Sequence, residues 1–208
     1  DALESYRLDE AANAVYGFFW HAYCDWTLEL SKPTLRADGE AATQTRQVLV
    51  HVLDQALRLL HPFMPFVTEE IWTRLPLQER ATNHIMVAAW PEADERRLDE
   101  AATQSLDQVI EVISAVRAVR GENRISPRTG LTVHVSTPDE TTTQLILSSS
   151  EYLSHVAGVA TLEVAANAER PPKSAVAIAG SCKVYVPLEG LVDLAEELGR
   201  LEKAMTKL

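Results

Sequence analysis

The chain has 208 residues, of which 46% are hydrophobic, and it carries a formal net charge of −11. This length permits one large domain or two modest ones with a filled core. No apolar run approaches the roughly 18–20 residues that cross a bilayer, and the polar start lacks a signal-peptide pattern. We therefore expect a cytoplasmic protein without a membrane partner. Because basic residues supply most non-specific affinity for nucleic acid, an RNA partner would require a local basic cluster.

The first predicted element is a helix over residues 8–30. Its large apolar residues recur at alternating spacings of three and four, which places them on one face directed at a core. They are Tyr16, Phe19, Tyr23, Trp26 and Leu30. Phe18 and Trp20 fall off this face, so they are candidates for contact with unpaired bases or an adjoining domain. Pro33 and Gly39 are expected to end the helix and connect it to the next.

The residue types that bind metals are sparse. Cys24 and Cys182 lie far apart in the sequence, which argues against a disulfide scaffold or a zinc module. His21 and Cys24 are one helical turn apart, but two ligands without a third do not make a metal site. Core packing explains this pair better, and we predict no metal.

A second helix is predicted over residues 40–60. Its expected apolar stripe comprises Val48, Val52, Leu53, Ala56, Leu59 and Leu60. Pro62 and Pro65 follow, and because a proline lacks an N–H and disfavours α geometry in the preceding residue, the helix must stop near His61. Thr68 is the expected cap of a short helix over residues 68–75. We interpret this proline corner as a structural joint between packed helices.

A third long helix is predicted over residues 99–120, ended by Gly121. Before it, the apolar segment 85–91 is expected to cross the bundle in an extended conformation, followed by a charged link. Four arginines against one glutamate begin in the last helical turn and run into the next loop. They are Arg117, Arg120, Arg124 and Arg128. Two interpretations stay open: a solvated helix end that favours cations, or contacts with phosphates.

Beyond Pro127 the hydrophobic period changes from that of a helix to that of a strand. Alternation predicts a strand through Leu131, Val133 and Val135. Thr137 and Pro138 then look like the cap and first position of a helix toward residue 148. Three further strands are predicted over residues 161–164, 175–179 and 183–186, with a turn at Gly180-Ser181 joining the last two.

The apolar residues from Leu191 to Leu208 keep the a/d spacing of a coiled coil, and the stripe is still running at the last residue. We therefore predict an α+β chain with a helical bundle over residues 1–128, a small α/β subdomain over 129–188 and the start of a coiled-coil arm over 189–208. The absence of an initial Met and this interrupted stripe suggest a fragment of a larger protein.

Catalytic motifs are missing. The sequence has no Gly-x-Gly-x-x-Gly, Walker loop, Gly-x-Ser-x-Gly or His-Glu-x-x-His, and its eight glycines are too scattered to cradle a phosphate. We predict no active site and no bound cofactor in this chain.

Several segments resemble a known family. Residues 60–72, with the two prolines, resemble the signature of the anticodon-binding helical domain of class I aminoacyl-tRNA synthetases of the valine, leucine and isoleucine group. Residues 19–33, with Cys24-Asp25-Trp26, and residues 186–203 are similar to the valine-specific branch. Residues 116–127 are similar to the exit of that helical domain into its α/β subdomain. The resemblance covers essentially the whole chain.

The resemblance implies a function in binding tRNA(Val). In the family, ATP and Mg²⁺ serve aminoacylation in catalytic domains that, with the editing domain, would lie upstream of Asp1, and the parent enzyme is expected to be a monomer. The resemblance also implies that Lys203 and Lys207, four residues apart on the arm, approach the tRNA, although a solvated coiled-coil flank would present the same lysines. The competing hypothesis is a coiled-coil structural or assembly module without RNA binding.

Overall fold

The computed structural model describes residues 2–37, 39–77 and 82–191, and the chain forms two compact units, Asp1–Leu98 and Asp99–Leu208. The predicted α+β class is confirmed: the first unit is helical and the second contains a four-stranded sheet. Among the described residues, no helix has the length and apolar character needed to cross a membrane. The division after Leu98 differs from the boundary expected near residue 128, because the long helix before that boundary packs against the sheet.

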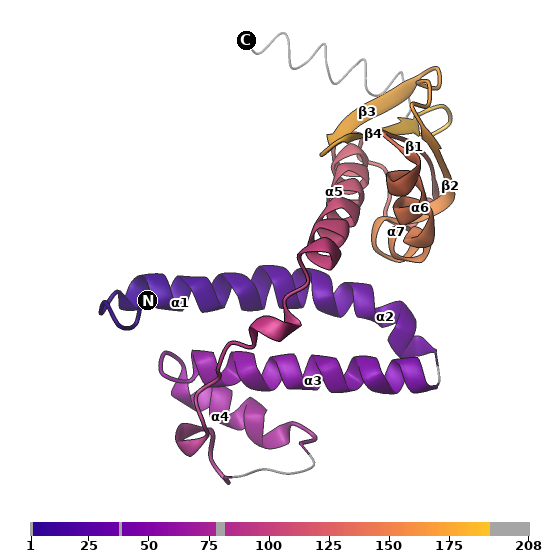
Figure 1. The fold of residues 1–208 in the computed structure, drawn as a ribbon. Coiled ribbons are helices and arrows are strands. Elements are labelled where there is room, and N and C mark those ends of the chain that lie inside the picture. Colours follow the sequence, from indigo (N-terminus) through magenta and orange to yellow (C-terminus); the bar gives the residue numbers. More distant parts are fainter. Residues whose placement is uncertain (1, 38, 78–81, 192–208) are drawn as a thin grey trace. The chain divides into compact units, whose positions relative to one another are not determined.

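The first unit opens with one continuous helical rod beside a second long helix (Figure 1). The rod comprises α1 (Leu8–Gly17), a π-helical segment η1 (Phe18–Leu28) and α2 (Glu29–Arg36). The second helix, α3 (Glu40–Leu60), has the predicted bounds and follows Gly39, whose φ of 128° suits a glycine. Pro33 does not end the first helix as predicted. A proline removes only its own N–H, and the next turn closes through Ala37 N donating to Pro33 O (3.4 Å).

The π-helix explains why the predicted apolar face is wrong at its first member. Tyr23 and Leu30 are buried as expected, and the Tyr23 hydroxyl donates to Leu49 O at 3.0 Å, but Tyr16 is 54% exposed. A π-helix bonds each residue to the fifth along, so the spacing that aligns residues on an α-helix drifts out of phase. The stripe of α3 is likewise displaced, since Val48 is exposed while Leu49 and Leu57 are buried.

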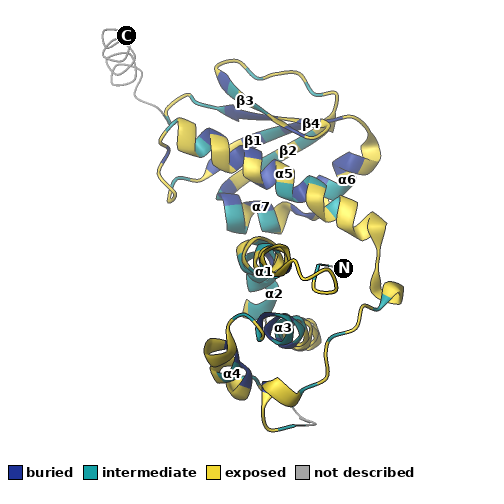
Figure 2. Ribbon diagram, turned by 90° about the vertical axis from the view of Figure 1, so that its left-hand side faces the viewer, coloured by how far each residue is buried: buried dark blue, intermediate teal, exposed yellow. Residues whose placement is uncertain are grey.

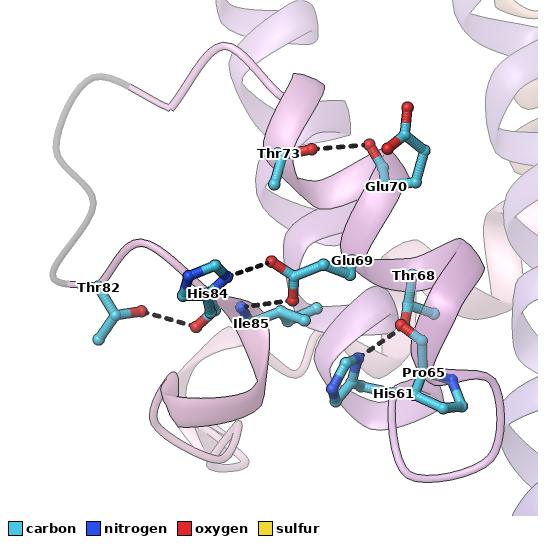
Figure 3. Close-up of polar contacts among 9 residues, drawn as sticks. All are labelled: His61, Pro65, Thr68, Glu69, Glu70, Thr73, Thr82, His84 and Ile85. Atoms are coloured by element: carbon cyan, nitrogen blue, oxygen red, sulfur yellow. Dashed lines mark hydrogen bonds and ion pairs between the residues drawn. The ribbon is translucent and has the colours of Figure 1, made fainter.

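The proline corner joins α3 to α4 (Pro65–Arg74) through a polar joint (Figure 3). As predicted, α3 stops just before His61. The prediction that Thr68 caps the next helix is wrong, because Pro65, whose missing N–H needs no partner there, starts it three residues earlier. Thr68 is instead buried inside α4, where its hydroxyl donates to Met64 O (2.7 Å) and accepts from His61 Nδ1 (2.7 Å).

A buried carboxylate holds the core of the first unit. Asp54 of α3 accepts from Trp72 Nε1 of α4 at 2.6 Å and pairs with Arg58 at 2.8 Å. Trp72 packs with Leu57 and with Ile85 of the short 3₁₀ turn η2 (Ile85–Val87). The segment predicted to be extended therefore starts as a helical turn, whose Ile85 N–H donates to Glu69 of α4 at 3.1 Å (Figure 3). A second turn, η3 (Glu95–Arg97), ends the unit.

The second unit packs α5 (Glu100–Glu122), α6 (Glu140–Ser148) and α7 (Ser150–Ala157) against a sheet (Figure 2). The sheet order is β2-β1-β4-β3, with β1 and β2 parallel and the other pairs antiparallel. The strands are β1 (Leu131–Thr137), β2 (Val159–Ala166), β3 (Ser174–Ala179) and β4 (Cys182–Pro187). All four strands and the turn between β3 and β4 were predicted.

Two details of the second unit correct the expectations. Thr137 is the last residue of β1, and α6 is capped by Asp139, whose carboxylate accepts from Thr142 N at 2.8 Å. Asp139 was overlooked because it follows a proline that resembled a helix start. The helix α7 had no predicted counterpart, and together with α6 it forms the crossover that a parallel β1–β2 pair requires. Its C-terminal glycine, Gly158, has φ 67°.

Candidate nucleic-acid interface

The loop after α5 begins with a left-handed residue that is not glycine. Arg124 has φ 52°, and the turn is closed by Ile125 N donating to Arg120 O (2.9 Å) and Arg124 N donating to Gly121 O (3.2 Å). This pair of bonds is the Schellman motif, in which glycine usually takes the left-handed position. The predicted helix end at Gly121 is therefore wrong: Gly121 stays helical and Arg124 takes the strained position, at a cost of about 1 kcal/mol or more. We call residues 123–129 the arginine loop.

The Arg120 side chain forms hydrogen bonds to the backbone of the arginine loop. Its Nη1 donates to Ser126 O at 2.5 Å, and its Nη2 lies within hydrogen-bond distance of the carbonyls of Thr129 (3.0 Å), Ala157 (3.1 Å) and Gly158 (3.3 Å). A Cβ at Gly158 would stand 2.9 Å from Nη2 and would displace the guanidinium, and the φ of 67° at this residue also favours glycine. Burial lowers the pKa of the Arg120 guanidinium. Arg120 thus links the loop to the end of α7.

The other three arginines face solvent. Arg117 lies on the last turns of α5, and Arg124 and Arg128 lie in the arginine loop. Within the described part of the chain, no carboxylate lies within ion-pair distance of these three guanidiniums. A tight turn from Ser126 to Thr129, closed at 3.0 Å, contains Pro127 and fixes the backbone at Arg128. The four predicted arginines therefore divide into one that is bound to backbone and three that are available to a ligand.

A second surface is aromatic and lies on the rod of the first unit. The rings of Tyr16 and Trp20 stack with their centroids 6.2 Å apart and an interplanar angle of 3°. Phe18 is 45% exposed and Trp20 50%, in agreement with their predicted position off the core face. Phe19 stacks on the buried Tyr23, with the ring centroids 5.8 Å apart. In both pairs the two residues are four apart in the sequence, a spacing that places their side chains on the same face of a helix, one above the other.

Of the residues considered as metal ligands, His21 contacts a carboxylate on its own helix. His21 Nδ1 lies 3.3 Å from Asp25 Oδ2 on the exposed side of the rod. Cys24 and Cys182 are free thiols, and burial raises the pKa of each. In residues 2–37, 39–77 and 82–191, no group of three His, Cys, Asp or Glu side chains is placed to hold a metal ion.

Comparison with known proteins identifies the family. The family described as the anticodon-binding domain of tRNA ligase matches residues 1–135. The chain belongs to this family. It is 37% identical over 204 residues to a valine–tRNA ligase of Staphylococcus carnosus, 38% over 205 residues to one of Geobacillus stearothermophilus and 39% over 208 residues to one of Syntrophotalea carbinolica. Each match covers at least 98% of the chain and 23% of the relative.

Six of the eight predicted RNA-contacting residues fall inside the region that matches the anticodon-binding domain family. They are Phe18, Trp20, Arg117, Arg120, Arg124 and Arg128. The remaining two, Lys203 and Lys207, lie outside the described residues, as does the predicted coiled-coil stripe after Leu191. The candidates that the structure describes therefore form two sets, an aromatic set on the first unit and an arginine set on the second.

A third feature of this anticodon-binding domain was not predicted from the sequence. An open groove of about 930 Å³ lies between α3 and the segment from Ala89 to Arg97. Trp90 stands at its side, and Arg96 and Arg97 line it. The signal in the sequence was a tryptophan followed within seven residues by two arginines. Because Asp94 and Glu95 precede those arginines, the stretch looked like an ordinary charged link.

Proposed function

We propose that this chain is the tRNA-binding portion of a valine–tRNA ligase and that its partner is tRNA(Val). The support is the match to the anticodon-binding domain family together with identities of 37–39% to valine–tRNA ligases. The chain spans 23% of those relatives. The ATP- and Mg²⁺-dependent ligation of valine, and editing, are then performed by other parts of a cytoplasmic, monomeric ligase, while this chain itself holds no cofactor.

The observation that carries the proposal is the arginine loop together with Arg117 on the adjoining helix α5. Arg117, Arg124 and Arg128 present three guanidiniums without a carboxylate partner among the described residues, on a chain whose formal net charge is −11. Guanidinium groups bind phosphates bidentately, and the release of counterions from RNA supplies the affinity. Contacts of this kind fix the position and orientation of the tRNA and read no base directly.

Arg120 acts in this proposal as a positioning residue. Its hydrogen bonds to the carbonyls of Ser126 and Thr129 hold the arginine loop in one conformation before RNA arrives. A preorganised loop loses less conformational entropy on binding. The exposed rings of Phe18 and Trp20 are proposed to stack on unpaired bases, and Lys203 and Lys207 to approach the same tRNA.

The test uses a variant that removes charge without harming the fold. Arg124→Gly places a glycine at φ 52°, where glycine is favoured, and Arg128→Gln removes the second loop charge. We expect the double variant to bind a tRNA(Val) transcript more weakly in fluorescence anisotropy across a salt series. The slope of log Kd against log salt should fall by about 1 for each phosphate that the variant no longer binds.

The matched control is Arg74→Gln, which removes an exposed arginine that is already paired with Glu70 in α4. It should leave both Kd and the salt slope unchanged. If the double variant keeps the affinity and salt slope of the parent chain, the arginine loop does not contact RNA.

A further inference from the structure

The groove between α3 and segment 89–97, which we call the Trp90 groove, has one aromatic side. Trp90 is 49% exposed, and Leu59 and Pro91 line the groove with it. The backbone beside the indole is tied to α3, because Arg58 Nη1 donates to Ala89 O at 3.3 Å while the same guanidinium pairs with the buried Asp54. The indole is therefore carried by a tethered segment, although much of its surface remains open to solvent.

Two guanidiniums share a single carboxylate at the rim of the groove. Asp94 accepts from Arg96 Nε at 2.8 Å and from Arg97 Nε at 3.2 Å. The hydrogen bond from the Arg96 side chain is the main cause of the lowered pKa of Asp94, so this carboxyl stays ionised at neutral pH. The side chains of Arg96 and Arg97 are 90% and 68% exposed. They can turn toward a new anion without leaving a buried charge behind.

A histidine sets the orientation of the second guanidinium. Arg97 Nη1 lies 3.0 Å from His51 Nε2 on α3. An arginine only donates, so this histidine nitrogen must accept, and the interaction requires a neutral imidazole with its proton on Nδ1. This contact joins Arg97, the last residue of segment 89–97, to α3 on the other side of the groove.

The charge of the lining differs from that of the whole chain. Three arginines and two carboxylates line the groove, whereas the chain has 19 basic and 30 acidic residues. Of the two carboxylates, Asp94 is bound to both rim arginines. Glu92 is exposed and, among the described residues, forms no ion pair. An aromatic side with paired guanidiniums at the rim suits a ligand that has a flat ring and a phosphate.

We propose that the Trp90 groove binds one unpaired nucleotide of RNA, with its base stacked on Trp90 and its phosphate on Arg96 and Arg97. This inference rests on the proposed RNA-binding function and adds a site to it. Stacking on an aromatic side chain is tolerant of base identity, so the groove selects single-stranded over paired RNA more than one base over another. Glu92 opposes the phosphate, and its neutralisation strengthens binding.

The experiment measures binding of a fluorescent single-stranded octaribonucleotide to the chain by anisotropy. Trp90→Leu should weaken binding about tenfold, which corresponds to about 1.4 kcal/mol and lies within the range for one stacked base. Trp90→Phe should recover part of the loss, and Arg96→Gln with Arg97→Gln should flatten the salt dependence. Glu92→Gln should increase affinity. The control is Val87→Ala, an exposed apolar residue of η2, which should have no effect.

The outcomes separate this site from the arginine loop. Equal binding of a duplex of the same length, or unchanged binding by Trp90→Leu, overturns the groove proposal. Trp90→Leu could leave octamer binding unchanged while the Arg124→Gly, Arg128→Gln variant still binds tRNA(Val) more weakly. In that case the groove proposal fails and the proposed function is kept. If neither variant alters binding of the octamer or the tRNA, both proposals fail. Weaker octamer binding by Trp90→Leu with an intact fold, measured by circular dichroism, supports the groove.

Discussion

The two units bury their apolar residues to very different extents (Figure 2). In the second unit, Leu131, Val133 and Val135 of β1 are fully buried, as are Ile113 and Val116 of α5. The first unit buries Leu57 and Trp72 as thoroughly, but most of the exposed large apolar side chains of the described residues lie there. They include Tyr6 at 88%, Phe66 at 91% and Met86 at 75%.

The difference shows that the second unit relies more on the burial of apolar faces than the first unit does. In the second unit, strand alternation and a helix stripe supply matching apolar faces, and burial of these faces carries its stability. The first unit joins its helices through polar contacts at the proline corner and through the Asp54 carboxylate. Its exposed aromatic surfaces fit a unit that makes further contacts, since large apolar patches on proteins mark interaction sites. The following variants test this contrast.

The largest expected effect is a cavity in the core of the second unit. Ile113→Ala removes a fully buried side chain and should lower the free energy of unfolding by about 3 kcal/mol. All four tryptophans lie in the first unit, so their fluorescence reports on that unit while far-ultraviolet circular dichroism reports on both. In urea titrations, we expect the dichroism transition to shift and the fluorescence transition to stay.

The control for this cavity is Leu106→Ala on the same helix, where the side chain is 44% exposed and the change should stay within about 0.5 kcal/mol. If the fluorescence transition moves together with the dichroism transition, the two units unfold as one. The stability of each unit could then not be assigned to its own packing.

Removal of the buried Asp54 carboxylate should have the next largest effect. Asp54→Ala deletes the buried carboxylate shared by Trp72 and Arg58 and should cost about 2–3 kcal/mol, because it removes a buried charge-assisted hydrogen bond and a buried ion pair. The fluorescence transition should shift. Asp25→Ala, which removes an exposed pair with His21, should change stability by less than about 0.5 kcal/mol. Equal effects of the two variants would show that the Asp54 contacts do not stabilise the first unit.

Two glycine substitutions should change the stability by smaller amounts and in opposite directions. Arg124→Gly relieves a left-handed arginine and should raise stability by about 1 kcal/mol, whereas Arg117→Gly puts a glycine into α5 and should lower it by about the same amount. Thermal unfolding followed by circular dichroism measures both. A loss of stability in Arg124→Gly would show that the Arg124 side chain stabilises the loop and is not free to bind RNA.

The smallest effect is the acid dependence of the α6 cap. The Thr142 N–H bonded to Asp139 lowers the pKa of this carboxyl below its usual 3.8. The pKa of Asp139 is therefore lower in the folded state than in the unfolded state. The cap stabilises the fold at pH values above the pKa of the unfolded state, and this contribution is lost as the pH falls through the pKa of the folded state. Asp139→Asn keeps a cap without a titrating group. The difference in Tm between the parent and the variant should be constant above about pH 5 and should change below about pH 4. A flat difference down to about pH 2.5 would contradict the prediction.

Most helices and strands could be predicted from the sequence because the residues that determine their limits lie close together in the chain. The limits of α3 and the positions of the four strands follow from apolar periodicity, prolines and turn residues. Errors arose where two local signals competed. Pro65 and Thr68 both mark helix starts, and Gly121 and Arg124 both lie near a helix end. In each pair the prediction fell on one residue, whereas the helix start or the left-handed turn formed at the other.

The candidate interface was predicted in part for the same reason. The sequence by itself determined the family resemblance, the α+β class, the exposed position of Phe18 and Trp20, and the presence of four arginines in one stretch. Only the tertiary structure separated Arg120 from its neighbours, because its acceptor Gly158 lies 38 residues away, and only the fold brings α3 beside Trp90 to form a groove. Periodicity and capping act over one or two helical turns, whereas the choice of a hydrogen-bond partner depends on which distant backbone the fold brings within about 3 Å of a side chain.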